Sequence, residues 1–299
     1  MTAAPAPVTS TATPTLLQDL IMLTKPRIIS LLLVTTVAPM FVAGSPGWAL
    51  VAIVTVGGYL MAGGANAVNM YMDRDIDDRM ARTRLRPIPS GRMTPRSVLA
   101  FGVALATAAT FLLATQVNVP SAALALGGFY FYVFIYTRWL KRSTPQNIVV
   151  GGAAGAFPPL VGWAAVTGGV DLLAVYLFLI VFYWTPPHFW ALALLKQRDY
   201  SRAGVPMAPL IWGERETMGQ MFWYTLILIG LTTMPVAFGA FGMIYLVSSL
   251  TLGLILLAGV VRMMMAKDWT GPAWQVYKYS LLYLALLFVA MAVDRKIPL

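Results

Sequence analysis

The residues of this 299-residue chain that could do chemistry gather in one stretch, NMYMDRDIDDRMARTRLRPIPSGRM, at positions 69–93. It holds four aspartates and six arginines, although only 11% of the chain is charged. Asn69, Asp73 and Asp77 recur every four residues, which puts their side chains on one face of a helix. Carboxylates aligned in this way repel one another unless a cation lies among them. The spacing therefore predicts a cation site.

Mg²⁺ is the cation that we expect Asn69, Asp73 and Asp77 to hold. It prefers oxygen ligands, uses one or two carboxylates and completes its shell with water and substrate phosphate. The neighbouring arginines disfavour a bare cation but suit a cation–polyphosphate complex, because guanidinium binds phosphate oxygens in pairs. The pattern predicts a diphosphate held through magnesium. The alternative is a solvated loop whose arginines only fix membrane topology.

A second polar stretch, WTPPHFWALALLKQRDYSRAGVPMAP, covers residues 184–209. Lys196, Asp199 and Arg202 repeat there at three-residue spacing. We expect these charges to close over the same diphosphate and a second metal ion. The alternative is a basic helix end of the kind that is common at membrane surfaces.

The elements that position these residues are long apolar runs, because 59% of the chain is hydrophobic. Runs of this length indicate an all-α polytopic membrane protein. Glycines in the fifth run (Gly151, Gly152, Gly155 and Gly162) predict close helix packing. The predicted spans are 28–44, 49–70, 97–116, 121–139, 147–167, 171–193, 218–238, 242–261 and 277–294.

Basic residues are divided unequally between the two sets of alternating connections. Nineteen of the 21 lysines and arginines fall in one set, and the other set holds only Arg295 and Lys296. By the positive-inside rule, the N-terminus and the charged loops are cytoplasmic and the C-terminus is outside. We therefore expect the chemistry at the cytoplasmic face of a bacterial inner membrane.

Composition also excludes several classes of site. The chain has no cysteine and one histidine, which rules out disulfides, thiolate sites and multi-histidine metal centres. The net charge of +10 comes from short loops rather than a basic domain, so we predict no nucleic-acid partner. Residues 1–15 have neither a secretory nor a transit pattern and predict a disordered tail. Residues 16–27 then form an interfacial segment, and 28–299 a single transmembrane domain.

The Asn69-xxx-Asp73-xxx-Asp77 ladder resembles the first aspartate-rich motif of the UbiA-type intramembrane prenyltransferases. The strings at 69–93 and 184–209, and RSTPQNIVVGGAAGAFPPLVGWAA, are similar to the heme-farnesylating branch of that family. The resemblance runs from Thr24 onward and implies nine helices around a central cavity open to the cytoplasm and to lipid. Many relatives have two or three aspartates in the second loop, whereas this chain has only Asp199.

The resemblance implies that farnesyl diphosphate and heme B are the substrates and heme O the product. Asp73, Asp77, Asp199 and Lys196 are then the expected catalytic residues, with Asp199 a further metal ligand. A downstream heme-modifying enzyme or an oxidase assembly factor is an expected partner. The candidates for diphosphate contacts are Arg82, Arg86, Lys141, Arg142 and Lys196.

Other functions remain open from the sequence. A prenyltransferase acting on a quinone or chlorophyll precursor would need the same ladder. A secondary transporter would place its charged residues near the middle of the membrane, whereas here they lie at one face. A heme-handling assembly factor without catalysis is a further alternative.

His188 follows Pro186 and Pro187 inside an apolar run, where paired prolines predict a distorted helix. An ionisable residue in a membrane span points to function, and imidazole is a common ligand of heme iron. We expect His188 to face heme B. The alternatives are a core histidine bonded to a carbonyl that the prolines leave free, and an acid or base.

The unequal charge distribution predicts the outcome of a reporter-fusion experiment. A reporter that is active only in the periplasm should be active when fused after Leu299 and silent when fused after Arg92. The reason is that nineteen cations hold the charged loops in the cytoplasm. The reverse pattern would move the predicted site to the other side of the membrane.

Overall fold

The computed structural model describes residues 14–297, and its regular elements over that range are helices. Nine helical segments in this part of the chain are long and apolar enough to span a membrane, which confirms the predicted fold class. The elements are α1 (Leu16–Thr24), α2 (Pro26–Ala43), α3 (Trp48–Met72), α4 (Arg74–Arg79), α5 (Pro95–Gln116), α6 (Val119–Tyr130), η1 (Phe131–Leu140), α7 (Lys141–Ser143), α8 (Asn147–Gly151), α9 (Ala153–Thr167), α10 (Leu172–Leu195), α11 (Gln197–Ala203), α12 (Ala208–Ile211), α13 (Glu214–Ala237), α14 (Met243–Met265) and α15 (Thr270–Asp294).

The spans close into a ring, because each one packs against the next in sequence and α15 returns to α2. The most extensive contacts across the ring are those between α2 and α9 and between α10 and α15. The fourth span is α6, η1 and α7 in succession, and the fifth is α8 followed by α9. Helices satisfy their own backbone groups, which hydrocarbon requires of any spanning segment.

Polar caps fix where several spans begin. Thr94, Asn118 and Asp171 each accept a hydrogen bond from the backbone N–H three residues later, at 3.2, 2.9 and 3.1 Å. These caps satisfy N–H groups that have no partner inside the helix.

The predicted span boundaries agree with the helices within about four residues, with one exception. The last span was predicted to begin at residue 277, but α15 begins at Thr270. Its first two turns contain Trp274, Gln275 and Tyr277, which lowered the hydropathy without stopping the helix.

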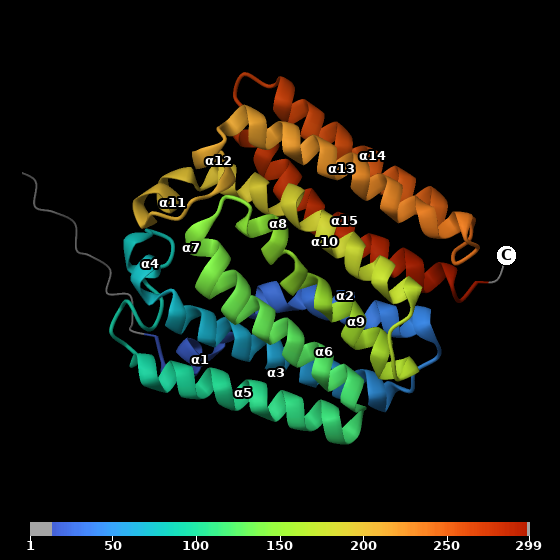
Figure 1. The fold of residues 1–299 in the computed structure, drawn as a ribbon, viewed down its shortest axis with the longest axis horizontal. Coiled ribbons are helices and arrows are strands. Elements are labelled where there is room, and N and C mark those ends of the chain that lie inside the picture. The colour runs from blue at the N-terminus through green and yellow to red at the C-terminus, as the bar shows by residue number, and fades with distance from the viewer. Residues whose placement is uncertain (1–13, 298–299) are drawn as a thin grey trace, which may run out of the picture.

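The charged connections lie together at one end of the bundle. Figure 1 shows α4, α7, α11 and α12 at that end and the C-terminus at the opposite end. The clustering agrees with the expected single charged face of the protein. The side of the membrane on which this face lies stays a prediction.

The short helix α1 is joined to this end by an ion pair. Asp19 is buried and accepts hydrogen bonds from Arg92 Nε at 2.9 Å and Arg92 Nη2 at 2.9 Å. The predicted tail over residues 1–15 lies, except for Pro14 and Thr15, outside the described residues. The interfacial role of residues 16–27 stays a prediction.

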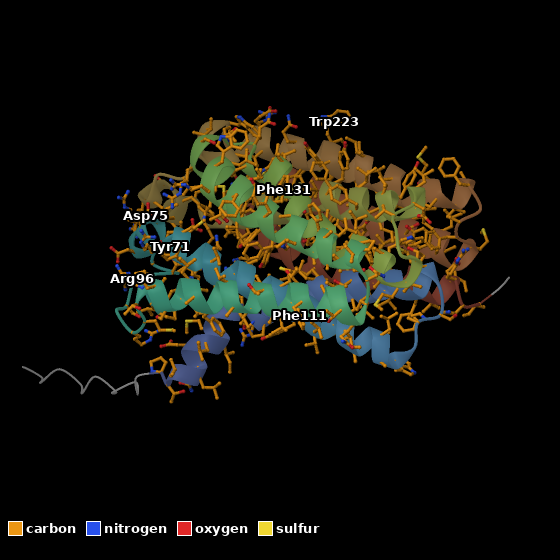
Figure 2. The ribbon with its side chains drawn as sticks, turned by 60° about the horizontal axis from the view of Figure 1, so that its bottom comes forward. Tyr71, Asp75, Arg96, Phe111, Phe131 and Trp223 are labelled. Carbon is orange, nitrogen blue, oxygen red and sulfur yellow. The ribbon has the colours of Figure 1, made fainter. Side chains whose placement is uncertain are left out.

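Large apolar side chains cover the outside of the ring, as a lipid-facing surface requires. Phe111 and Trp223 are 71% and 61% exposed, and Figure 2 shows them on the flanks of the bundle, away from Asp75 and Arg96 at its charged end.

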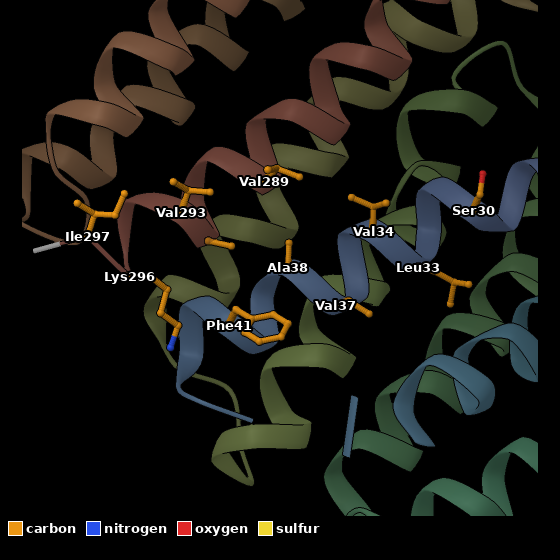
Figure 3. Close-up of a pocket in the computed structure, with 11 residues that line it drawn as sticks. Ser30, Leu33, Val34, Val37, Ala38, Phe41, Val289, Val293, Lys296 and Ile297 are labelled. Atoms are coloured by element: carbon orange, nitrogen blue, oxygen red, sulfur yellow. The ribbon is translucent and has the colours of Figure 1, made fainter. Parts of the chain in front are cut away.

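An apolar groove of about 630 Å³ lies between α2 and α15, where the ring closes. Val34, Ala38 and Phe41 line one wall and Val289 and Val293 the other (Figure 3). At one end of the groove, Lys296 Nζ donates to the Gly44 carbonyl at 3.0 Å and to Ser45 Oγ at 2.8 Å.

The predicted glycine packing is confirmed at three of the four positions. A Cβ on Gly162 would overlap the backbone carbonyl of Thr36, and Cβ atoms on Gly151 and Gly152 would press on Tyr136 and Thr185. Gly155 has open space instead. Close approach of α9 to α2 therefore depends on Gly162.

Gly162→Ala should lower the melting temperature of the detergent-solubilised protein by about 2–8 °C, because the added methyl group pushes α9 away from α2. Gly155→Ala is the matched control on the same helix and should shift it by no more than about 1 °C. Thermal unfolding followed by circular dichroism measures both. Equal shifts would contradict the role given to Gly162.

Candidate active site

The predicted ladder follows the end of α3 into α4. The N–H of Asp73 donates to the Asn69 carbonyl at 2.9 Å, and the N–H of Asp77 donates to the Asp73 carbonyl at 2.8 Å. These bonds keep helical spacing across the junction, where Asp73 itself leaves α-helical geometry. The structure therefore brings Asn69, Asp73 and Asp77 onto one face, as their spacing predicted. All three are buried, with at most 4% of each residue exposed.

Each carboxylate of the ladder contacts a cation from another element. Lys141 Nζ lies 2.5 Å from Asp73 Oδ2, and Arg86 Nη1 lies 2.6 Å from Asp77 Oδ2. Lys141 is the first residue of α7, directly after η1, and Arg86 comes from the loop between α4 and α5. Two of the predicted diphosphate residues are thus in direct contact with the predicted metal ligands.

Arg142 pairs mainly with Asp75, outside the ladder. Its two Nη atoms donate to the Asp75 carboxylate at 2.8 Å each, and Nη2 lies 3.7 Å from Asp73 Oδ1. The hydrogen bond from Arg142 lowers the pKa of Asp75 to about 2. Asp75 is exposed (Figure 2) and holds Arg142 at the rim of the ladder.

Sequence reasoning missed Lys25, which it assigned only to topology. Lys25 Nζ donates to Asn66 Oδ1 and Asn69 Oδ1, both at 3.2 Å. Burial, and then the charge of Arg86, lower the pKa of this ammonium to about 7. Its position beside Pro26, on the same side of the membrane as the ladder, was the available signal.

Thr137 was also missed, because it depends on the π-helix η1. Thr137 Oγ1 donates to the Tyr132 carbonyl, five residues earlier, at 2.8 Å and accepts from Asn69 Nδ2 at 3.1 Å. Asn69 Nδ2 also donates to Asp73 Oδ2 at 2.8 Å. A π-helix shifts the face that its side chains present, and such helices are frequent at functional sites. Hydropathy does not distinguish a π-helix from an α-helix, so it could not have predicted η1.

The second loop approaches the ladder through α11, which packs against α4. Tyr200 of α11 is buried, which raises its pKa; Arg82 and Arg86 are near enough to lower it. Arg82 itself is exposed. The electrostatic field of the arginine cluster thus extends to Tyr200.

Lys196 and Asp199 line a separate polar cavity of about 610 Å³ with Glu214 and Thr270. Lys196 Nζ lies 5.5 Å from the centre of the Trp274 ring, a cation–π contact. Within residues 14–297, neither Lys196 nor Asp199 forms an ion pair with the ladder. Their predicted closure over the diphosphate stays a prediction.

His188 lies on α10, which stays helical from Leu172 to Leu195 with Pro186 and Pro187 inside it. A distortion of the helix at these prolines stays a prediction. Its ring stacks between Trp184 and Tyr277, with centroid distances of 4.4 and 4.9 Å. Nδ1 lies 2.8 Å from Ser280 Oγ of α15. The hydrogen-bond partner is therefore this hydroxyl, in place of a carbonyl freed by the prolines.

The ladder fits a magnesium ion that arrives with its anion. Asp73 Oδ1 is buried and has no hydrogen-bond partner, so one carboxylate oxygen is free for a ligand. Within the described residues, no group of three or more His, Cys, Asp or Glu side chains is placed to hold a metal. Two carboxylates and an amide leave half of an octahedral shell to water and phosphate, which suits Mg²⁺.

Comparison with known sequences gives one family and close relatives. The profile of the family described as "UbiA prenyltransferase family" matches residues 31–292. A protein of Roseiflexus sp. (strain RS-1), named protoheme IX farnesyltransferase, is 55% identical over 94% of this chain. The chain spans only about half, 53%, of that relative's length. A protein of the same name from Symbiobacterium thermophilum is 51% identical over 93% of this chain and 94% of its own length.

Solved structures share the fold. A UbiA homologue from Archaeoglobus fulgidus, described as bound to DMAPP and Mg²⁺, superposes with a TM-score of 0.63 at 14% sequence identity. The similarity covers 92% of this chain and 99% of that one.

Proposed function

The chain belongs to the UbiA prenyltransferase family, and we propose that it transfers the farnesyl group of farnesyl diphosphate to a vinyl group of heme B. The product, with a hydroxyl group added from water, is heme O. Support comes from relatives named protoheme IX farnesyltransferase, one of which matches this chain along almost its whole length.

The observation that carries the proposal is the buried ladder with its cations. Asp73 and Asp77 supply two negative charges, and Lys141 and Arg86 supply two positive ones in direct contact with them. Lys25, whose pKa is lowered to about 7, adds a third positive charge beside Asn69 when it is protonated. An excess of positive charge suits a diphosphate that enters with magnesium and disfavours a bare cation. The A. fulgidus homologue, described as bound to DMAPP and Mg²⁺, supports the same pairing.

Asn69, Asp73 and Asp77 would hold the ion, whose charge stabilises the departing diphosphate. Lys25, Lys141 and Arg86 neutralise the ladder before substrate arrives, and phosphate oxygens are competing acceptors for the same N–H groups. These side chains then stabilise the charge that develops on the leaving group. Arg82 and Arg142 lie at the rim, and Lys196 and Asp199 reach the bound substrate from the other side of the α4–α11 contact.

The reaction begins when the C1–O bond of farnesyl diphosphate breaks and its electron pair leaves with the diphosphate. The π electrons of a heme vinyl group form the new bond to C1, and the resulting cation is stabilised by the porphyrin. Water adds to that cation and loses a proton. The overall change consumes farnesyl diphosphate, heme B and water, and releases heme O, diphosphate and a proton.

Aromatic side chains of η1, α9 and α10 would line the farnesyl chain. The rings of Tyr132 and Tyr136 stack with their centroids 5.7 Å apart. The Phe178 ring contacts that of Phe157 at a centroid distance of 5.9 Å and stacks on that of Phe182 at 6.2 Å. These rings exclude water, and their π faces stabilise the allylic cation. Attack by the vinyl group then outpaces hydrolysis.

His188 is proposed as an axial ligand of the heme B iron. It is the single imidazole of the chain, and cysteine is absent. Its stacked ring is also held in one orientation. The site would lie on the cytoplasmic side of a bacterial inner membrane, where a downstream heme-modifying enzyme or oxidase assembly factor receives the product.

Purified protein in lipid nanodiscs, given farnesyl diphosphate, heme B and Mg²⁺, should form heme O in mass spectra of extracted porphyrins. Asp73→Asn or Asp77→Asn should lower this turnover at least 100-fold (an order-of-magnitude expectation), because magnesium needs the anionic oxygens. The matched control is Asp78→Asn, which alters an exposed carboxylate of α4 that forms no ion pair within the described residues and should keep turnover within about threefold.

Diphosphate release without a porphyrin product would assign the chain a different prenyl acceptor. Near-normal turnover of Asp73→Asn and Asp77→Asn would remove the metal role from the ladder. Equal loss of turnover in Asp78→Asn would show that activity depends on the charge of the whole loop and not on the buried face of the ladder.

His188→Ala should weaken heme B binding and shift its Soret band, because iron loses an axial nitrogen ligand. Farnesyl diphosphate binding should stay within about twofold, because the ladder is untouched. Absorption titration with heme B and calorimetric titration with farnesyl diphosphate measure the two effects. An unaltered heme spectrum at saturating protein would exclude the ligand role.

A further inference from the structure

We propose that Ser280 is a positioning residue that determines which ring nitrogen of His188 faces the heme. The inference rests on the proposed function, since it assumes that heme B enters beside His188. It adds a residue on α15 that has no ligand contact of its own and acts by fixing the tautomer of the imidazole.

The proton assignment follows from two short contacts at one hydroxyl. Ser280 Oγ lies 2.8 Å from His188 Nδ1 and 2.8 Å from the Tyr277 carbonyl. A hydroxyl carries one hydrogen, and a carbonyl can only accept. Both contacts are hydrogen bonds only when Ser280 donates to Tyr277 and His188 Nδ1–H donates to Ser280. The neutral ring then carries its proton on Nδ1.

This tautomer leaves the lone pair on Nε2, at the far edge of the ring. Within residues 14–297, Nε2 forms no hydrogen bond, and His188 is only half-buried. Neutral imidazole binds iron through the nitrogen without the proton, and the partner of the other nitrogen decides which one that is. Ser280 therefore presents Nε2 to the substrate.

The surrounding side chains prevent the ring from turning. Trp184 and Tyr277 cover its two faces, with interplanar angles of 12° and 20°. Trp184 Nε1 donates to the Ser280 carbonyl at 2.8 Å, so the same serine holds both the imidazole and one of the rings that cover it. Ser280 is fully buried. The cluster joins α10 to α15, which pack across the ring of spans.

The test compares heme B binding by full-length variants in nanodiscs. Ser280→Ala should weaken binding about tenfold and alter the Soret band, because the ring loses the partner that fixes its tautomer. Ser280→Thr keeps the hydroxyl and should restore both to near wild type. The matched control is Ser249→Ala on α14, a fully buried serine that donates to the carbonyl three residues earlier but has no histidine contact.

A second measurement does not depend on how the methyl group of threonine packs. In His188→Gly, added imidazole should restore the heme spectrum about tenfold better than 1-methylimidazole, which has no N–H to donate to Ser280. In the double variant His188→Gly/Ser280→Ala, this preference should fall to about twofold or less. A spectral signature of this kind reports the hydrogen bond and would not follow from a merely structural role.

The outcomes separate the two proposals. If His188→Ala leaves the heme spectrum unchanged, the ligand role and the role of Ser280 both fail. If His188→Ala changes the spectrum but Ser280→Ala behaves like Ser249→Ala, only the positioning role is overturned. Persistence of the imidazole preference in the double variant overturns it as well.

Discussion

Asp73 and Asp77 are almost fully buried at the end of a membrane-spanning helix, where a carboxylate stays ionised only if a cation lies against it. The cations come from three separate parts of the chain: Lys141 from the start of α7, Arg86 from the loop after α4, and Lys25, through Asn69, from the α1–α2 junction. Neutralising the ladder therefore draws these three segments together. The same requirement builds a site with surplus positive charge, which a diphosphate can use.

The second loop connects this site to the cluster around His188. Helix α11 of this loop packs against α4, and α10, directly before it, carries His188. Tyr277 of α15 covers one face of the His188 ring. The second loop is therefore part of both halves of the proposed site.

How far the sequence predicts this structure depends on the range of each interaction. The spans follow from hydropathy, and the shared face of Asn69, Asp73 and Asp77 follows from helical spacing, so both were predictable. Lys25 and Ser280 act across more than 40 and 90 residues of sequence, and spacing carries no trace of such contacts. Thr137 reaches Asn69 because η1 is a π-helix, and hydropathy does not distinguish a π-helix from an α-helix.

Lys25 shows how the backbone and the charge of the site are coupled. It has a left-handed conformation, with φ of 56°, which costs a non-glycine residue roughly 1–2 kcal/mol. Asn66 offsets this cost by donating to the Thr24 carbonyl at 3.0 Å while its own oxygen accepts from Lys25 Nζ. Glycine would relieve the strain but would remove the ammonium from Asn69. Strain retained at a charged residue points to function, and here it directs a third positive charge at the ladder without adding another loop to the crowded face.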